Sequence, residues 1–555
     1  MNPSRLWQGR ERYTVFDTAY GDGKRAAALI EAWRKDEERP ARLHIVALAD
    51  GLLPGFHRIP QAQEGVTLDL LSAPLDTALA QLAARIDFVQ LHGLRGPNTG
   101  FARGLARLAA PDARLAFDWL EQEQVAALMA QGFVFSGKEL SGGARFASRK
   151  PRQPLAPVPA REAIVIGAGL AGCAAAERLC ARGWQVTLVE RHAGPAREAS
   201  GNLAGIFMPL LSKDDNIPTR LTRAAYLYAL RYWEALGGVG KTIEGAACGV
   251  MQLARDAQHA AASRAIAAAG RYPRGFAEWL EAEPATALLG LPAPDGAWLF
   301  RQGGWARPGS VCEAMLAACG ERLTRHFGAG DVTLERVGDE WEVRGAGGII
   351  ARAATVVLAG GAASTQIAQA SRLPLSALRG QVTHLDAATL PQLPFVLCRE
   401  AYLTPAANGI ACAGATYDLD GDPRLRASSQ QENLERLRAL VSNPAAGHGA
   451  PLRGRVGFRC VAPDRLPLVG ALPDFDGAGG TERLRDVPRH PGLFSLLGYA
   501  SRGLIWAPLC AELLVARLEN EPLPLESTLV DALDPARFVL RARRTGRVPP
   551  IFAPD

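Results

Sequence analysis

Residues 163–190 read AIVIGAGLAGCAAAERLCARGWQVTLVE, and this stretch decides the fold of most of the chain. Its first residues, Ala163–Ile166, have the length and the β-branched content of a buried parallel strand. A glycine-rich turn follows, then small apolar residues at helical spacing, and then a second strand, Gln185–Val189. A strand, a G-x-G-x-x-G turn, a helix, a second strand and a closing acid predict a dinucleotide-binding unit.

The glycines and the acid each have a predicted task in such a unit. Gly167 permits the tight turn, Gly169 lets the backbone approach a pyrophosphate, and Gly172 lets the helix and the strand pack closely. Free N–H groups at the start of the helix bind the phosphates. Glu190 is expected to accept hydrogen bonds from the adenosine ribose. A structural unit of the same shape that binds no nucleotide is the alternative.

The composition is that of an ordinary globular protein of 555 residues, long enough for more than one domain. No apolar run is long enough to span a membrane, and the stretch MNPSRLWQGRER has no apolar core for a secretory signal, so we expect a cytoplasmic protein without a membrane partner. The nine cysteines include no C-x-x-C pair, which predicts neither disulfides nor a bound metal. The net charge of +6 permits a polyanionic partner without requiring one.

Two domains joined by a linker are expected. Within residues 1–146, a strand at Tyr13–Asp17, a glycine-bearing turn, a helix at Lys24–Lys35 and a strand at Leu43–Leu48 outline a Rossmann unit of the nucleotide or S-adenosylmethionine type. Residues 147–162 are rich in proline and basic residues, which favours an extended linker. A surface loop within a single domain is the alternative for this stretch.

Several later segments are expected to complete a flavin site around the dinucleotide-binding unit. The polar and glycine residues of 200–205 break any helix and line the flavin side, and Asp331–Leu334 returns toward the cofactor. Gly492–Leu504 is a strand, a glycine-rich turn and the start of a helix, whose N-terminus stabilises the anion of a reduced flavin. The further residues predicted to bind the cofactor are Arg191, Ser200, Gly201, Asn202, Gly205, Val332, Gly360, Gly498, Ser501, Gly503 and Leu504.

Longer motifs in the same region resemble one protein family. SGN at 200–202, PLLSKDD at 209–215 and RVGFRCVAPDRLPLVG at 455–470 are similar to motifs of the bifunctional tRNA 5-methylaminomethyl-2-thiouridine biosynthesis proteins. Residues 163–540 resemble the oxidoreductase half of that family, and 541–555 remain as a C-terminal tail. The resemblance implies a chain of mixed α/β and α+β class, in which an FAD-binding domain carries a β-rich substrate domain of the D-amino acid oxidase type.

The resemblance implies oxidation of 5-carboxymethylaminomethyl-uridine at the tRNA wobble position. FAD takes a hydride from the glycine-like carbon, and hydrolysis of the imine releases glyoxylate and leaves a 5-aminomethyl group. The substrate carboxylate needs a fixed cation, for which an arginine fork is well suited. The predicted catalytic residues are Arg459 and Arg502 as carboxylate anchors, Lys213 as a substrate or flavin contact, and Tyr402 and Tyr417 as pocket walls. We expect a monomer.

The first domain resembles the methyltransferase half of the family but departs from its motifs. Ala19 replaces a glycine of the cofactor turn, and the acid after the second strand falls at Ala49, with Asp50 adjacent. His92 replaces an expected aspartate, and an imidazole cannot replace a carboxylate acceptor. We therefore expect a degenerate domain in which S-adenosylmethionine methylation is weak or lost, with retained methyl transfer as the alternative.

Two other functions fit the sequence. One is an FAD-dependent oxidase of free glycine, sarcosine or D-amino acids, which shares the fold and the hydride chemistry. The other is a flavin-bearing scaffold that binds tRNA without oxidising it.

Overall fold

The computed structural model describes residues 7–60, 65–94, 98–135, 143–147, 158–449, 453–477, 479 and 481–545. The chain divides into two compact units, which we describe separately. The first comprises Met1–Pro159 and Glu512–Asp531, and the second comprises Ala160–Ala511 and Ala532–Asp555. The sequence pattern indicates the boundary before residue 163. It does not indicate that Glu512–Asp531, which we call the late segment, belongs to the first unit. Most of the predicted linker, 148–157, lies outside the described residues.

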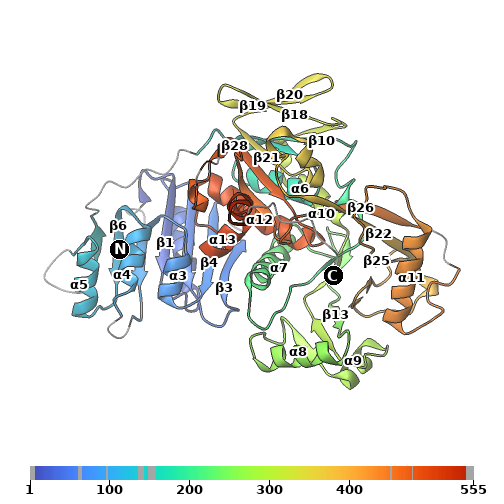
Figure 1. The fold of residues 1–555 in the computed structure, drawn as a ribbon. Helices are drawn as coiled ribbons and strands as arrows, with labels where there is room; N and C mark the ends of the chain where they lie inside the picture. Colours follow the sequence, from blue (N-terminus) through green and yellow to red (C-terminus); the bar gives the residue numbers. More distant parts are fainter. Residues whose placement is uncertain are drawn as a thin grey trace. The chain divides into compact units, whose positions relative to one another are not determined.

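An eight-stranded sheet forms the first unit (Figure 1). Its order is β3-β4-β2-β1-β5-β6-β8-β7, in which β4, β2, β1, β5 and β6 run parallel and the other strands add antiparallel edges. Successive parallel strands are added on both sides of β1, with β2 and β4 on one side and β5 and β6 on the other. This is the Rossmann arrangement that the sequence predicts. The strands are β1 (Arg12–Asp17), β2 (Arg42–Leu48), β3 (Gly55–Pro60), β4 (Val66–Ser72), β5 (Ile86–Leu91), β6 (Ala109–Phe117), β7 (Phe133–Phe135) and β8 (Ala144–Phe146).

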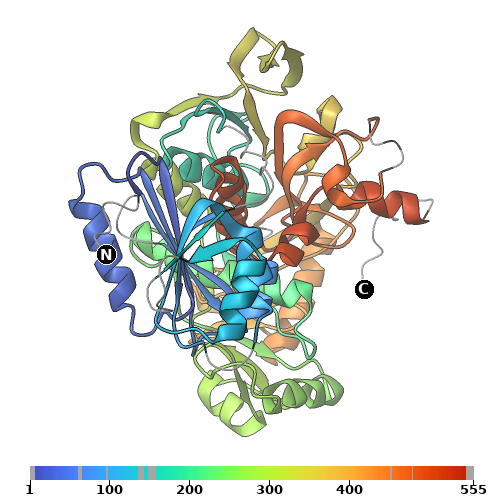
Figure 2. The ribbon, with the colours of Figure 1, turned by 90° about the vertical axis from the view of Figure 1, so that its left-hand side faces the viewer.

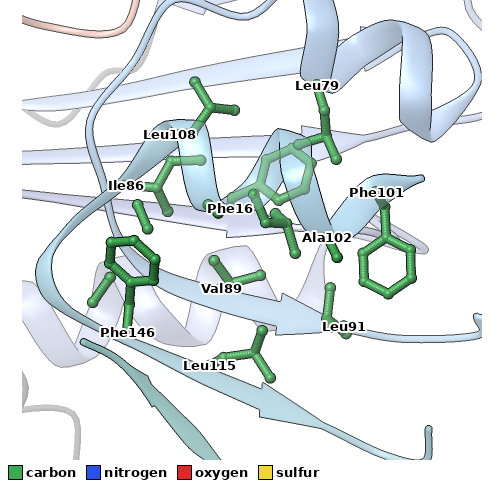
Figure 3. Close-up of a cluster of buried hydrophobic side chains, with 14 of the residues drawn as sticks. Phe16, Leu79, Ile86, Val89, Leu91, Phe101, Ala102, Leu108, Leu115 and Phe146 are labelled. Atoms are coloured by element: carbon green, nitrogen blue, oxygen red, sulfur yellow. The ribbon is translucent and has the colours of Figure 1, made fainter. Parts of the chain in front are cut away.

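Helices cover both faces of this sheet, as buried parallel strands require. Figure 2 shows α2 (Lys24–Lys35) on one face and α3 (Leu75–Gln81) and α4 (Phe101–Leu108) on the other. Along β1 the side chains alternate: Tyr13 belongs to the core beneath α2, whereas Phe16 belongs to the cluster beneath α3 and α4 that Figure 3 shows. A fourth helix, α5 (Gln122–Ala130), contributes to that second cluster.

The late segment joins the first unit through a buried charge. Helix α12 (Gly503–Leu518) begins in the second unit, and its residues from Glu512 onward belong to the first. The Arg58 guanidinium, 2% exposed, donates to both carboxylate oxygens of Asp69 at 2.9 and 2.7 Å. It also donates to Glu512 Oε1 at 2.8 Å and to the carbonyl oxygen of Pro522 at 2.5 Å. The N-terminal chain and the late segment therefore share one buried polar cluster.

A six-stranded sheet forms the centre of the second unit, in the order β17-β10-β9-β21-β28-β27. The strands from β17 to β28 are parallel, and β27 is antiparallel. Helix α6 (Leu170–Cys180) connects β9 to β10 and is followed by Gly183 with φ +84°. The strands are β9 (Glu162–Ile166), β10 (Gln185–Glu190), β17 (Leu323–Phe327), β21 (Thr355–Leu358), β27 (Leu468–Pro473) and β28 (Arg489–Leu497).

A second large sheet provides the β-rich part of this unit. Its order is β14-β15-β13-β23-β24-β25-β22-β26, and α11 (Ala427–Val441) packs on β22 and β25. Two three-stranded sheets, β11-β16-β12 and β18-β19-β20, complete the unit. Their strands are β11 (Gly205–Phe207), β12 (Gly245–Ala246), β16 (Gly304–Ala306), β18 (Thr333–Val337), β19 (Glu340–Gly345) and β20 (Gly348–Ala353). The strands of the large sheet are β13 (Val250–Leu253), β14 (Glu278–Leu280), β15 (Ala297–Phe300), β22 (Ser376–Asp386), β23 (Val396–Cys398), β24 (Tyr402–Leu403), β25 (Ile410–Gly414) and β26 (Gly454–Val461).

The remaining helices of the second unit are α7 (Ile217–Ala235), α8 (Ala257–Ala268), α9 (Ala282–Leu289), α10 (Pro308–Ala318) and α14 (Arg537–Thr545). Because α14 extends to Thr545, the stretch that the sequence predicts as a tail begins within a helix. No helix in the described ranges is long and apolar enough to cross a membrane. In the same ranges, no three His, Cys, Asp or Glu side chains are grouped so that they could hold a metal ion.

Replacing Arg58 with methionine is predicted to destabilise the first unit by about 3–5 kcal/mol, because the Asp69 carboxylate stays buried without its cation. Denaturant unfolding, followed through the transition of this unit, measures the loss. Arg34→Ala, which removes only an exposed ion pair with Glu31, is the control and should shift stability by less than about 1 kcal/mol. Equal midpoints for the two variants would contradict the structural role of Arg58.

Candidate active site

The glycine-rich turn after β9 is closed by direct backbone packing. Gly167 has φ +104°, and a Cβ at this position would lie 2.7 Å from the carbonyl oxygen of Ala359. A Cβ at Gly172 would overlap the Gly167 carbonyl oxygen and lie 2.9 Å from its carbon. Neither position can accept a side chain, so α6 lies directly on the turn with its N-terminus at the carboxyl end of the sheet.

Two polar side chains hold this turn in place. The buried Glu190 carboxylate accepts hydrogen bonds from the N–H groups of Ala168 at 2.7 Å and His192 at 3.0 Å. Ser200 Oγ accepts from the Leu170 N–H, in the first turn of α6, at 3.1 Å. Each of these oxygens keeps capacity for a further hydrogen bond. The acid and the hydroxyl therefore lie at the turn where the sequence predicts the ribose and the phosphates.

Val332 and Arg191 lie beside the end of β10. The N–H groups of Gly328 and Ala329 donate to the carbonyl oxygens of His192 and Glu190 at 2.7 and 3.0 Å, which ties the two segments together. Arg191 pairs with Asp331, and Val332 packs on the core that includes Val189. These contacts place both predicted residues beside the end of β10.

The N-terminus of α12 lies close to the N-terminus of α6. A Cβ at Gly503 would lie 3.2 Å from Leu170 Cδ1, and one at Gly205, in β11 (Gly205–Phe207), would lie 2.8 Å from Leu504 Cδ1. Gly498 turns the chain toward the helix with φ +77°. The structure thus brings the two glycine-rich turns together, although they are more than three hundred residues apart in sequence.

The remaining predicted cofactor residues lie around these turns. Gly360 follows β21, and its Cα would lie 2.8 Å from a Cβ at Gly167. Gly201 ends the short 3₁₀ helix that carries Ser200, and Asn202 follows it. Ser501 is exposed in the turn before α12. The sequence did not indicate Arg455, whose guanidinium lies against Gly201 and donates to the carbonyl oxygens of residues 197 and 198 at 2.5 Å.

Four of the five predicted catalytic residues gather at the large sheet. The Arg459 guanidinium lies 4.6 Å from the centroid of the Tyr417 ring, and its Nη1 donates to the Thr416 carbonyl at 3.4 Å. Arg502 Nη1 donates to the Met208 carbonyl at 3.4 Å. Within the described chain neither guanidinium pairs with a carboxylate. Two arginine side chains that make long carbonyl contacts, and in the case of Arg459 a ring contact, are suited to an anionic ligand.

Burial sets the protonation of this cluster. Desolvation lowers the pKa of Arg502 from its usual value, while nearby Tyr417 and Cys398 oppose that shift. Burial raises the pKa of Tyr402 above its ordinary value, Cys412 adds to this, and the Arg459 charge opposes it. The cluster therefore combines cationic guanidinium groups with a tyrosine hydroxyl that keeps its proton.

Lys213 is not brought to this cluster by any contact in the described residues. It is exposed in the turn before α7, and its carbonyl oxygen accepts a hydrogen bond from Arg271 at 2.7 Å. Its role as a substrate or flavin contact stays a prediction. Five residues before Lys213, the carbonyl oxygen of Met208 does contact the cluster, because it accepts the hydrogen bond from Arg502.

Comparison with known proteins defines the class first. Residues 162–517 match the family described as "FAD dependent oxidoreductase", so this chain is an FAD-dependent oxidoreductase. The fold is shared with glycine oxidase from Geobacillus kaustophilus (TM-score 0.57, 21% identity, 68% of this chain and 98% of that chain). It is also shared with iminodiacetate oxidase from Chelativorans sp. BNC1 (TM-score 0.53, 25% identity, 65% of this chain and 96% of that chain).

Curated relatives narrow the assignment. The chain is 41% identical over 589 residues to the tRNA 5-methylaminomethyl-2-thiouridine biosynthesis bifunctional protein MnmC of Azoarcus sp. (strain BH72), covering 98% of this chain and 92% of the relative. The protein of the same description from Paraburkholderia xenovorans (strain LB400) is 39% identical with the same coverage. The chain belongs to this family, which confirms the resemblance seen in its sequence.

The residues of the glycine-rich turns fit the FAD that this class carries. The turn leaves no room for side chains at Gly167 and Gly172, the N-terminus of α6 lies at this turn, and Glu190 is fixed beside it. This is the chemistry that a dinucleotide needs, namely N–H donors for the pyrophosphate and a carboxylate for the ribose.

Gly172→Ala is predicted to abolish retention of FAD, because the added methyl group forces α6 away from the turn. The ratio of flavin absorbance to protein after purification measures this. Gly347→Ala, at a position with open space, is the control and should retain the cofactor fully. A flavin content for Gly172→Ala equal to that of the control would show that the close contact is dispensable.

The raised pKa of Tyr402 means that its hydroxyl stays protonated at pH values where a free tyrosine ionises. The pH dependence of flavin reduction is therefore expected to come from the substrate amine alone. Tyr402→Phe is predicted to lower the rate while leaving the midpoint of the pH profile unchanged between pH 7 and about 10. Stopped-flow reduction across that range checks it, and a shifted midpoint in the variant would assign the titration to Tyr402 instead.

Proposed function

We propose that this protein oxidises the carboxymethylaminomethyl group of a modified wobble uridine in tRNA and leaves a 5-aminomethyl group. The observation that carries the proposal is the pair of guanidinium groups, Arg459 and Arg502, that lack carboxylate partners in the described part of an FAD-dependent oxidoreductase. The substrate side chain is an N-alkylated glycine, so it brings the carboxylate that these groups need. The names of the two relatives, which concern tRNA 5-methylaminomethyl-2-thiouridine biosynthesis, support a tRNA substrate.

The protein residues bind and orient the substrate in this reaction. FAD, when bound, accepts a hydride from the carbon between the amine and the carboxylate. Arg459 and Arg502 hold the carboxylate and thereby orient that carbon. The amine must be neutral to lose hydride, and the neutral Tyr402 hydroxyl places no further charge beside it. The product imine adds water and separates into glyoxylate and the 5-aminomethyl nucleoside.

We propose that FAD is held by the two glycine-rich turns, with Glu190 at the ribose, Ser200 at the phosphates and the N-terminus of α12 at the flavin. The alternative substrate, a free amino acid such as glycine or sarcosine, uses the same carboxylate anchor. We propose a monomer that acts in the cytoplasm, where its tRNA substrate is found.

We further propose that methyl transfer by the first unit is weak or lost. Asp17, at the end of β1, is held by Arg25 Nε at 3.0 Å and by the Ala19 N–H at 2.9 Å, and Arg25 also donates to the Ala19 carbonyl. The predicted cofactor turn is thus filled by the protein's own ion pair. His92 Nδ1 lies 2.6 Å from Asp118, so the nearby carboxylate is bound to the imidazole.

Titration calorimetry with S-adenosylmethionine tests the first unit. No heat of binding is expected for the full-length protein, because Arg25 already binds the Asp17 carboxylate. Arg25→Ala is the informative companion, since it removes that ion pair. Tight binding by the unaltered protein would restore methyl transfer as an activity of this chain.

Anaerobic flavin reduction tests the oxidative function. The FAD-loaded protein is mixed with tRNA carrying 5-carboxymethylaminomethyl-uridine, and bleaching of the flavin is expected. Arg502→Met should lower the second-order rate by about 100-fold, because the carboxylate loses one charged partner. Arg372→Met is the control and should react normally, because Arg372 contacts only Asp476 and the Phe475 ring among the described residues.

Two outcomes would contradict the proposal. Bleaching by glycine or sarcosine but not by tRNA would make the protein an amino acid oxidase. Bound FAD that none of these substrates reduces would indicate a tRNA-binding scaffold.

A further inference from the structure

Three consecutive residues of strand β22, Arg379, Gly380 and Gln381, alternate between the two faces of the large sheet. Side chains alternate along a strand, so Arg379 and Gln381 point to one face and Gly380 to the other. Arg379 and Gln381 are both fully buried. The strand pairs with β26 in a register that sets Gly380 opposite Gly457 and Leu378 opposite Arg459. Gly380 therefore lies diagonally next to Arg459 on the same face of the sheet.

The Arg459 guanidinium occupies the space above Gly380. A Cβ at Gly380 would overlap Arg459 Nη1 and lie 2.6 Å from Cζ and 2.7 Å from Nη2. Gly380 has no positive φ, so its backbone conformation does not demand glycine. The reason for glycine here is the position of the arginine.

On the opposite face, Arg379 fastens the loop that carries Tyr417. We call residues 416–426, between β25 and α11, the 416–426 loop. Arg379 donates to the carbonyl oxygens of Asp422 at 2.8 Å and Arg424 at 2.7 Å, and to the Asp418 carboxylate at 2.9 Å. The backbone groups of Arg379 and Asp418 also exchange two hydrogen bonds at 2.9 and 3.0 Å.

Gln381 holds both ends of the same loop. Its backbone N–H donates to Thr416 Oγ1 at 3.1 Å. Its side-chain amide accepts from the Arg426 N–H at 2.8 Å and donates to the Arg426 carbonyl at 3.0 Å. The loop is therefore attached to β22 at its start, its middle and its end.

Residues on both faces of β22 determine the surroundings of the Arg459 guanidinium. Arg459 has Gly380 beneath it and Tyr417 against its face, and its Nη1 donates to the carbonyl of Thr416. All three neighbours are set by residues 379–381, because Gly380 leaves the space while Arg379 and Gln381 hold the loop. Tyr417 is 47% exposed, so the attached loop and not a surrounding core keeps its ring in place.

We propose that the Arg379-Gly380-Gln381 segment positions the carboxylate anchor, with Gly380 giving Arg459 its place and Arg379 holding Tyr417 against it. These are positioning residues that act through Arg459. The inference rests on the proposed function in so far as the anion bound by Arg459 is the substrate carboxylate. Such an arrangement fixes the anchor before the substrate arrives and lowers the cost of ordering it.

Gly380→Ala tests the proposal. The atoms that the new methyl group meets are the flexible end of Arg459, so the strand is expected to fold while the guanidinium moves. FAD content should stay that of the unaltered protein, and the second-order rate of anaerobic flavin reduction by tRNA should fall about tenfold or more. Gly457→Ala is the matched control on the paired strand, because its Cβ would make only an ordinary contact of 3.5 Å with Ala199.

A double-mutant cycle distinguishes positioning from a general structural effect. If Gly380 acts through Arg459, Gly380→Ala should have no further effect in an Arg459→Ala background. Additive losses, or a normal rate for Gly380→Ala, would overturn the proposal. If Gly380→Ala gives no soluble protein, Arg379→Lys, which cannot reproduce the fork of hydrogen bonds to the loop, takes its place in the same cycle.

The proposed function fails separately from this inference. If the unaltered enzyme is reduced by glycine and not by tRNA, the tRNA assignment is wrong, and the same cycle run with glycine still tests the segment through the glycine carboxylate. If no substrate reduces the flavin, the proposal that β22 positions a carboxylate anchor is overturned with it.

Discussion

The contact between the Gly172 position and the Gly167 carbonyl is the constraint on which the second unit depends. It allows α6 to lie on the turn after β9 with no side chain between them. The N-terminus of α6 then lies at the carboxyl end of the parallel sheet, beside the fixed Glu190 carboxylate. The start of α12 approaches the same point through Gly503 and Leu170. Two helix N-termini in one place create a region that favours the negative charges of a dinucleotide and of a reduced flavin.

The large sheet adds the complementary feature, a cluster that contains two cationic side chains. In the described residues, Arg459 lies against the Tyr417 ring, and both Arg459 and Arg502 donate long hydrogen bonds to carbonyl oxygens without a carboxylate partner. Burying a charged group that has few partners costs desolvation free energy. For Arg502, the same desolvation lowers the pKa of the guanidinium. Such a cost is typical of a functional site, where the ligand supplies the missing partner. The carboxylate of an amino-acid-like substrate is the partner that fits both the charge and the fork geometry.

The sequence predicted the features that depend on neighbouring residues. The fingerprint at 163–190 is local, so its strands, its helix and the tasks of its glycines could be read directly, and the start and end of α12 follow from its apolar run. Arg459 and Arg502 were identified from residue type and motif. The positioning role of residues 379–381 could not be predicted, because it depends on the register between β22 and β26 and on a loop some forty residues later. The role of Lys213 stays a prediction, because no contact of the described residues tests it.

The sequence also could not predict that the late segment packs in the first unit. The Arg58–Glu512 contact joins residues 454 positions apart, and an apolar helix such as α12 does not reveal which core its last turns enter. In the first unit, the parallel core strands β1 and β2 were predicted from the sequence. Edge strand β3 was not, because its His57, Arg58 and Pro60 break the apolar pattern, although Arg58 is buried by its ion pairs.

We propose that Arg459 and Arg502 bind the substrate carboxylate. The most direct measurement compares flavin reduction by two anticodon stem-loops that differ in one group, the carboxylate of the 5-carboxymethylaminomethyl substituent or the corresponding carboxamide. The carboxamide is expected to react about 100-fold more slowly, and this difference should disappear in the Arg459→Ala, Arg502→Met double variant. Equal rates for the two stem-loops with the unaltered enzyme would contradict it.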